Sequence, residues 1–171
     1  MEYTHVKHMF LPVYNEESRI LILGSFPSVK SRENQFYYGH PQNRFWKVLA
    51  GIFKETVPQT IEEKKTLLLT HHIAVWDVID SCDIVGSSDS SIKNVVPNDM
   101  GVILSKAEIH GIFANGGKAH QLFVKYCWKE GMPPLGKLPS TSPANAAWSL
   151  DRLTAEWKTA LEMYLSETSI R

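Results

Sequence analysis

Short apolar runs alternate with amphipathic stretches along this chain. The first run, residues 19–24, is apolar throughout, as a central strand of a parallel sheet should be because helices cover both of its faces. Three further runs are short and apolar enough to be strands of the same sheet. The four predicted strands are residues 19–24 (RILILG), 72–79 (HIAVWDVI), 109–115 (IHGIFAN) and 136–141 (GKLPST).

Helical spacing of apolar residues fills the intervals between these runs. Caps and stop signals mark several of the helix ends. The predicted helices are one carrying Phe45, Leu49, Ile52 and Phe53; one from the capping box of Thr60 and Glu63 through Leu69; a short one opened by residues 97–99; one within 118–129, with Leu122, Phe123, Tyr126 and Cys127 on its apolar face and Gly131 after it; and one from about Ser149, with Leu150, Leu153, Trp157, Leu161 and Leu165 in register.

Strands that alternate with helices predict an α/β protein with a mainly parallel sheet, here as a single domain over residues 1–171. Sheets of this kind bind ligands beyond the carboxyl ends of their strands. The loops expected there are rich in Gly, Ser, Asn and Pro. They are GSFPS (24–28), WDVIDSC (76–82), ANGG (114–117) and PSTSPAN (139–145).

Composition is ordinary for a globular protein, with 43% hydrophobic and 21% charged residues among 171. No apolar run approaches a membrane span, and the first residues do not resemble a secretory signal. Cys82 and Cys127 form no CxxC pair, so we expect a reduced, cytoplasmic protein, and we expect a monomer. Lys and Arg balance Asp and Glu at 18 each, which disfavours strong non-specific binding to nucleic acid.

Two loop motifs near the first strand carry candidate chemistry. In GSFPS, Gly24 permits a tight turn, and exposed backbone N–H groups could hold an oxygen or an anion; a purely structural turn fits equally well. In YYGHPQNRFW (37–46), Tyr37 or Tyr38 could stack on an unpaired base or pack in the core. Asn43 could cap the following helix, hold a water molecule or read a base edge.

The remaining polar segments give weaker signals. In LPSTSPANA (138–146), hydroxyl groups between two prolines could contact phosphate or sugar, or form a capped turn before the last helix. His71 and His72 would point to opposite faces of a strand, which argues against a shared metal. Asp77 follows an apolar run, but no second carboxylate motif is present that would make it part of an acid/base pair. Asp83 and Asp89 are expected in a solvated loop, and the polar run 87–94 could face DNA or simply be exposed.

The three segments GSFPS, QFYYGHPQNRFWKVL and LPSTSPANA, in this order, resemble the hypoxanthine-DNA glycosylase branch of the uracil-DNA glycosylase superfamily. HPQNRFWKVL is also similar to the mismatch-specific uracil/thymine branch. The resemblance covers roughly residues 19–160. It implies a three-layer α/β/α sandwich around a central four-stranded parallel sheet, no metal, no cofactor, and a monofunctional reaction that releases a base from DNA and leaves an abasic site.

The chain departs from the better-known branches at two positions. Phe26 stands where GQDPY and GINPG carry a catalytic Asp or Asn, and Leu138 stands where His or Asn precedes Pro-Ser. The resemblance then implies Asn43 as the catalytic amide. It further implies base contacts by Gly24, Ser25, Phe26, Tyr38 and Asn115, and DNA contacts by Ser28, Ser140, Thr141, Ser142 and Asn145.

The resulting hypothesis is a DNA-deoxyinosine glycosylase that acts on deaminated bases in double-stranded or single-stranded DNA. Three alternatives stay open: a uracil or mismatch glycosylase, a catalytically silent module that binds DNA lesions, and a hydrolase of free nucleosides. A duplex-binding assay across salt concentrations, paired with a base-release assay, separates an enzyme from the silent module. Asn43→Ala tests the catalytic amide, because base release should then fall steeply while folding stays intact.

Overall fold

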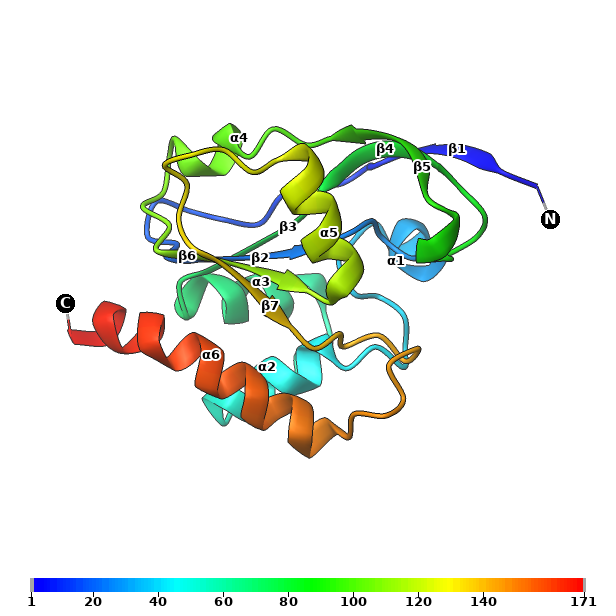
Figure 1. Ribbon diagram of the computed structural model, residues 1–171. Coiled ribbons are helices and arrows are strands. Elements are labelled where there is room, and N and C mark those ends of the chain that lie inside the picture. The colour runs from blue at the N-terminus through cyan, green and yellow to red at the C-terminus, as the bar shows by residue number, and fades with distance from the viewer. Residues whose placement is uncertain (1, 171) are drawn as a thin grey trace.

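A four-stranded parallel sheet forms the centre of the protein (Figure 1). The computed structural model describes residues 2–170, with side chains to residue 165. All neighbouring strands run parallel, in the order β3 (Ile73–Asp77), β2 (Ile20–Gly24), β6 (Gly111–Asn115), β7 (Leu135–Leu138). Every residue of β2 and β3 is buried, as the apolar runs predict. The α/β prediction and its four parallel strands are confirmed, although β7 ends three residues earlier than expected.

Helices cover both faces of this sheet and give three layers (Figure 1). One face carries α2 (Phe45–Phe53), α3 (Ile61–Thr70) and α6 (Leu150–Ile170). The opposite side carries α4 (Gly101–Leu104) and α5 (Gly117–Tyr126). The capping box of Thr60 and Glu63 opens α3 as predicted. The apolar face of α6 is buried at Leu153, Trp157 and Leu161, whereas Leu150 and, on α5, Tyr126 are exposed instead of buried.

A second sheet, which the sequence analysis did not predict, packs beside the first. It is antiparallel, in the order β1 (Thr4–Lys7), β4 (Ile79–Ile84), β5 (Lys93–Pro97). The predicted strand over residues 72–79 is therefore wrong at its end. One apolar run supplies strands to both sheets, because β3 ends at Asp77 and β4 begins at Ile79. The Asn98 side chain donates to the carbonyls of Asp77 and Ile79, on either side of this change.

The polar stretch between the strands of the second sheet is more ordered than expected. Asp83 lies within β4, where it pairs with His5 of β1, and it does not lie in a loop. Residues Asp89–Ser91 form a 3₁₀ turn, and the short helix expected at 97–99 begins only at Gly101. Local patterns do not reveal this sheet, because β1 and β5 are largely exposed and β4 pairs with the distant N-terminal strand β1.

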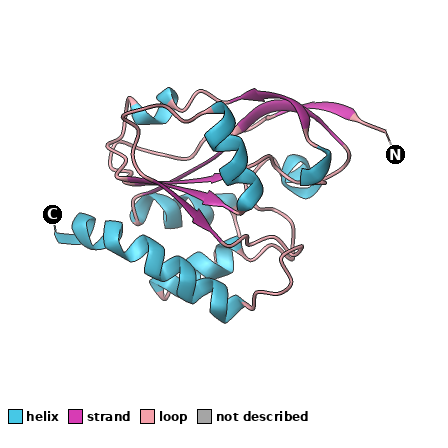
Figure 2. Ribbon diagram, viewed as in Figure 1, coloured by secondary structure: helices cyan, strands magenta, loops and turns pink. Residues whose placement is uncertain are grey.

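Loops gather where the parallel strands end (Figure 2). A short helix missed by the sequence analysis, α1 (Val29–Asn34), lies among them and follows directly on GSFPS. One hydrophobic core joins both sheets and the helices. Among the described residues, no helix is long and apolar enough to cross a membrane.

Candidate functional site

A pocket of about 350 Å³ lies beyond the carboxyl ends of the parallel strands. Its volume is in the range of small-ligand sites. The four predicted loops contribute to its walls, together with the segment that precedes α2. Of the predicted site residues, all but Asn145 line it: Gly24, Ser25, Phe26, Ser28, Tyr38, Asn43, Asn115, Ser140, Thr141 and Ser142. Asn145 lies in an adjoining groove with Trp148.

Gly24 ends β2 at the floor of this pocket, and the absence of a side chain there is a geometric requirement. A Cβ atom at this position would lie 2.5 Å from Oδ1 of Asp77 and 3.1 Å from the hydroxyl of Tyr38. Glycine therefore allows a carboxylate and a phenol to approach the same point. Asp77, at the end of β3, was given no role by the sequence, yet its side chain lines the pocket.

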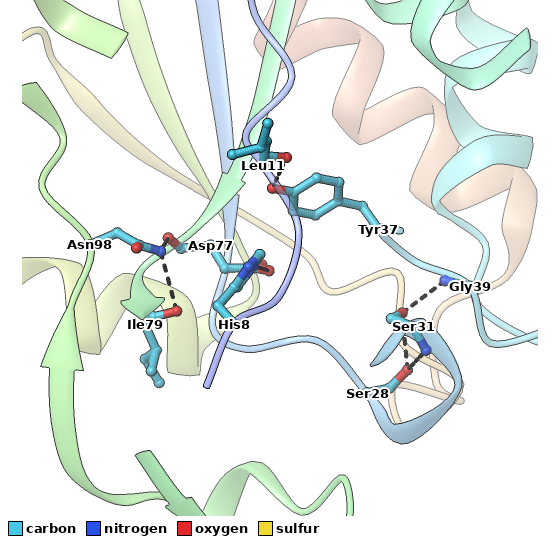
Figure 3. Close-up of polar contacts among 9 residues, drawn as sticks. All are labelled: His8, Leu11, Ser28, Ser31, Tyr37, Gly39, Asp77, Ile79 and Asn98. Carbon is cyan, nitrogen blue, oxygen red and sulfur yellow. Dashed lines mark hydrogen bonds and ion pairs between the residues drawn. The ribbon is translucent and has the colours of Figure 1, made fainter. Parts of the chain in front are cut away.

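The two adjacent tyrosines have different surroundings, which the sequence could not separate. Tyr37 is buried, and its hydroxyl donates to the carbonyl of Leu11 at 2.8 Å (Figure 3). Tyr38 adopts a left-handed backbone conformation (φ 53°) and stacks on Phe45, with ring centroids 4.0 Å apart. Tyr38 is thus the tyrosine whose polar end reaches the pocket floor.

The hydroxyl of Tyr38 is buried and has no hydrogen-bond partner among the described residues. Burial, followed by the negative charge of Asp77, raises the pKa of this phenol far above its ordinary value, and the nearby amide of Asn115 opposes the shift weakly. Tyr38 therefore keeps its proton at neutral pH. A buried donor without a partner at the floor of a pocket is suited to an acceptor on a ligand.

Asn43 holds its carboxamide in a fixed orientation at the pocket wall. Its Oδ1 accepts from the backbone N–H of Phe45 at 3.0 Å and from the hydroxyl of Thr141 at 2.9 Å. The expectation that Asn43 caps α2 is wrong, because Arg44 is the N-cap residue and Asn43 lies one position before it. Because both partners are donors, the oxygen is committed, and the amide nitrogen is the group available to a ligand.

Thr141 and Asn115 lock Asn43 in place from behind. Asn115, at the end of β6, donates from Nδ2 to the Thr141 hydroxyl at 3.0 Å and accepts from the Thr141 backbone N–H at 3.1 Å. Thr141 is fully buried, so a contact with DNA through its hydroxyl would break this chain of hydrogen bonds. The geometry makes Thr141 a support for Asn43.

Arg44 ties the segment before α2 to the loop between β7 and α6, and the sequence analysis gave it no role. Its guanidinium donates to the carbonyls of Ser142 at 2.9 Å, Asn145 at 3.0 Å and Trp148. A planar fork of donors suits three carbonyls in one loop better than a single ammonium would. Arg44 directly follows Asn43 in the HPQNR motif, and this position next to the candidate catalytic residue is the sequence signal that could have indicated that Arg44 supports the site.

The predicted serines mostly shape loops in this state of the protein. Ser28 caps α1 by accepting from the N–H of Ser31, whose hydroxyl in turn accepts from Gly39 (Figure 3). The hydroxyls of Ser140 and Ser142 accept from backbone N–H groups two residues further on. These serines lie along the rim of the pocket, and their contact with DNA stays a prediction.

Ser25 donates its hydroxyl to Oδ1 of Asp89 at 3.0 Å, which brings a second carboxylate to the pocket. Asp89 is exposed as a whole residue, but its carboxyl group is crowded by protein atoms. This desolvation raises the pKa of Asp89 above the usual range, against the opposing effect of the Ser25 hydrogen bond. Among the described residues, no cluster of three or more His, Cys, Asp or Glu side chains could hold a metal ion.

The fold and the pocket define a class of protein: a parallel α/β domain with a small pocket at its strand ends, lined by aromatic rings, fixed amides and the turn of residues 24–28. Residues 11–164 match the family model described as the Uracil DNA glycosylase superfamily. The chain therefore belongs to the uracil DNA glycosylase superfamily, as its three motifs predicted.

Similar proteins agree with this membership. A hypoxanthine DNA glycosylase of Methanosarcina acetivorans is 36% identical over 156 residues, 90% of this chain and 96% of the relative. A hypoxanthine DNA glycosylase of Methanosarcina barkeri is 35% identical over 116 residues, 66% of this chain and 73% of the relative. A solution NMR structure of a candidate uracil DNA glycosylase from Methanosarcina acetivorans has a TM-score of 0.71 at 33% identity, covering 88% of this chain and 92% of that one.

Proposed function

We propose that this protein is a monofunctional DNA glycosylase that hydrolyses the N-glycosidic bond of deaminated bases in DNA, chiefly hypoxanthine, and leaves an abasic site. The observation that carries the proposal is the fixed carboxamide of Asn43 in the wall of a small pocket that Gly24 and Tyr38 also line. The two curated relatives named hypoxanthine DNA glycosylase support the choice of base.

The target nucleotide leaves the duplex, at a cost of a few kcal/mol, and its base enters the pocket. Tyr38 borders the base at the pocket floor, where its ring rests on Phe45 and its unpaired hydroxyl points to the base. Contacts of the loop 140–145 with the DNA backbone hold the opened site. Cleavage passes through a sugar with oxocarbenium character, so a water molecule placed below the sugar completes the reaction.

Asn43 places that water through its amide nitrogen, because its oxygen is already engaged by Phe45 and Thr141. An amide is a poor base, so its contribution is orientation of the nucleophile. The leaving base gathers negative charge, which backbone N–H groups near Ser25 and Phe26 and the hydroxyl of Ser140 stabilise. The apolar ring of Phe26 keeps this region dry, which strengthens each of these hydrogen bonds.

Asn43 offers two variants that separate folding from catalysis. Asn43→Asp keeps an oxygen for both donors but replaces the amide N–H₂ with a second acceptor, whereas Asn43→Ala removes both groups. We expect each variant to lower single-turnover release of hypoxanthine by about 100-fold or more, because a misplaced nucleophile costs on that order. Gln42→Ala, in the same segment but outside the pocket, is the matched control.

The assay uses matched duplex and single-stranded oligonucleotides with one deoxyinosine, deoxyxanthosine or deoxyuridine, followed by alkaline cleavage at abasic sites. Unchanged turnover in both Asn43 variants contradicts the assignment. Preferential release of uracil favours the mismatch-type alternative, which the similar NMR structure, named as a candidate uracil DNA glycosylase, also supports. Binding to lesions without any release favours the silent module.

We further propose that the enzyme acts as a monomer in the cytoplasm. Both cysteines are free thiols buried in the core, as is usual where the environment is reducing. Light scattering with and without DNA tests the monomer, and the strandedness of the substrate follows from the oligonucleotide assay.

A further inference from the structure

A histidine from the N-terminal segment reaches the back of the pocket, where it meets Asp77 (Figure 3). Nε2 of His8 lies 2.8 Å from Oδ2 of Asp77, and the two side chains are only 3% and 5% exposed. An ionised carboxylate only accepts hydrogen bonds, so Nε2 of His8 is the donor. His8 precedes residues 11–164, over which the family model matches.

Several contacts fix the position of this histidine. Its backbone N–H donates to the carbonyl of Asp80 at 2.6 Å. Its ring is surrounded by Phe10, Phe26 and Tyr37, with centroids 4.5, 6.2 and 5.9 Å away. The hydroxyl of Tyr37 holds the same segment through the carbonyl of Leu11. The second sheet and the N-terminal segment thus deliver one donor to one oxygen of Asp77.

The other oxygen of Asp77 faces the pocket. No hydrogen bond to Oδ1 occurs among the described residues, and this atom lies beside Gly24, where the partnerless hydroxyl of Tyr38 also approaches. The floor of the pocket therefore presents one acceptor and one donor close together. The acceptor is fixed because His8 occupies the rest of the carboxylate.

We propose that Asp77 and the Tyr38 hydroxyl read the edge of the extruded base that deamination changes, and that His8 is the positioning residue for Asp77. The inference rests on the proposed function and specifies its substrate class. Deamination of adenine turns the ring nitrogen N1 from an acceptor into a donor and the exocyclic group from a donor into an acceptor. Hypoxanthine then offers N1–H to Asp77 and O6 to Tyr38, whereas adenine offers the reverse pattern to both.

A carboxylate out of water is tolerable only with a partner, which explains why His8 is needed behind it. Uracil carries the same N–H and oxo pair where cytosine carries an acceptor and an amino group. The floor thus selects deaminated bases as a class. Adenine would place its N1 acceptor against the Asp77 carboxylate, which cannot donate; because the Tyr38 phenol can accept as well as donate, the carboxylate carries the strongest rejection.

Two measurements test this selection. One is the ratio of single-turnover release of hypoxanthine to adenine from matched duplexes; the other is the affinity for free hypoxanthine against free adenine. The variants are Asp77→Asn, which adds a donor where only an acceptor stood, Tyr38→Phe, His8→Phe and His8→Gln. The matched controls are His5→Gln and Asp83→Asn, which alter a similar pair of the second sheet at 2.8 Å but outside the pocket.

We expect Asp77→Asn to lower the preference for hypoxanthine by about 10- to 100-fold, the range for one hydrogen bond to a charged group. Tyr38→Phe and His8→Phe lower it in the same direction, and His8→Gln, which keeps a side-chain donor, recovers part of it. A general loss of stability would reduce turnover of all substrates but leave the preference unchanged. An unchanged preference in Asp77→Asn, or an equal change in Asp83→Asn, overturns the inference.

The two proposals can fail separately. If the wild type releases no base from DNA but prefers free hypoxanthine through Asp77, only the proposed function is wrong. If the wild type releases hypoxanthine and Asp77→Asn keeps the full preference, only the selection by the pocket floor is wrong.

Discussion

Single hydrogen bonds decide what Asn43 can do. Its oxygen is taken by Phe45 and Thr141, so its chemistry is that of an amide nitrogen held still. The same holds for Asn115, whose two polar atoms both face Thr141. The residue type alone permits many roles for these asparagines. The hydrogen bonds that they already make within the protein exclude most of these roles.

Thr141→Val tests the support of Asn43 with almost no change of shape. Loss of the hydroxyl leaves Asn115 and Asn43 each without one partner, which costs about 1–3 kcal/mol of unfolding free energy. We expect base release to fall about tenfold as the amide of Asn43 loosens. Thermal unfolding and single-turnover assays measure the two effects. Thr159→Val, on the exposed face of α6, is the control and should have much smaller effects on stability and on base release. Equal losses in both variants would contradict the role of Thr141.

Asp89→Asn tests the carboxylate beside Ser25. The pKa of Asp89 is raised in the folded protein, so the folded state holds the proton more tightly than the unfolded chain does. Ionisation therefore destabilises the fold above the raised pKa, and no such cost exists below about pH 4, where both states are protonated. We expect Asp89→Asn to be more stable than the wild type at pH 7.

This advantage of Asp89→Asn should disappear as the pH falls below about 4. Denaturant unfolding of both proteins at a series of pH values measures this difference in stability. A lower stability of Asp89→Asn at pH 7 would show that the carboxylate is stabilising, contrary to the pKa shift.

Among the secondary-structure elements, those that line the pocket differ from those that only build the core. Helix α3 begins with a complete capping box, and its residues do not line the pocket. We expect Thr60→Ala to lower the unfolding free energy by about 1 kcal/mol, because the N–H of Glu63 loses its acceptor. Base release by folded protein should stay unchanged. Thr66→Ala, within the same helix, should not destabilise, and a loss of activity in Thr60→Ala would link α3 to the site.

The loop between β7 and α6 depends on Arg44, which reaches it from the segment before α2. Arg44→Lys keeps the charge but loses the fork of donors, so at least two loop carbonyls lose their partners. We expect KM for a deoxyinosine duplex to rise about tenfold with a smaller effect on kcat, because the loop binds DNA in the proposed function. Steady-state kinetics separate the two constants. Arg19→Lys is the control, because the Arg19 guanidinium also donates to loop carbonyls, those of Glu16 and Ser18, but outside the pocket.

Charge over the whole molecule limits how the protein can hold DNA. Positive and negative side chains balance at 18 each, so affinity cannot come from a broad basic surface. We expect the logarithm of duplex affinity to fall with the logarithm of salt concentration with a slope no steeper than about −3, which corresponds to roughly three phosphate contacts. Fluorescence anisotropy across salt concentrations measures this slope. A slope near −6 would indicate a basic groove that the balanced charge argues against.

At the scale of the whole molecule, the central sheet, the main helices and the location of the pocket could be predicted from the sequence. Buried strands and capped helices leave local periodic signals, so β2, β6 and α3 could be predicted from a few residues each. The motifs of the glycine turn, the HPQN segment and the last loop likewise marked the family and most of the pocket wall.

The second sheet and the polar floor of the pocket depend on contacts between distant segments. The strands β1 and β4 pair across the chain, and β1 and β5 are too exposed to carry an apolar pattern. His8 meets Asp77 across 69 positions of the chain, and Thr141 meets Asn43 across 98. Sequence patterns record which side chains are present and which face is apolar. Which polar atoms are already bonded depends on contacts between segments, and that decides which atoms remain for a substrate.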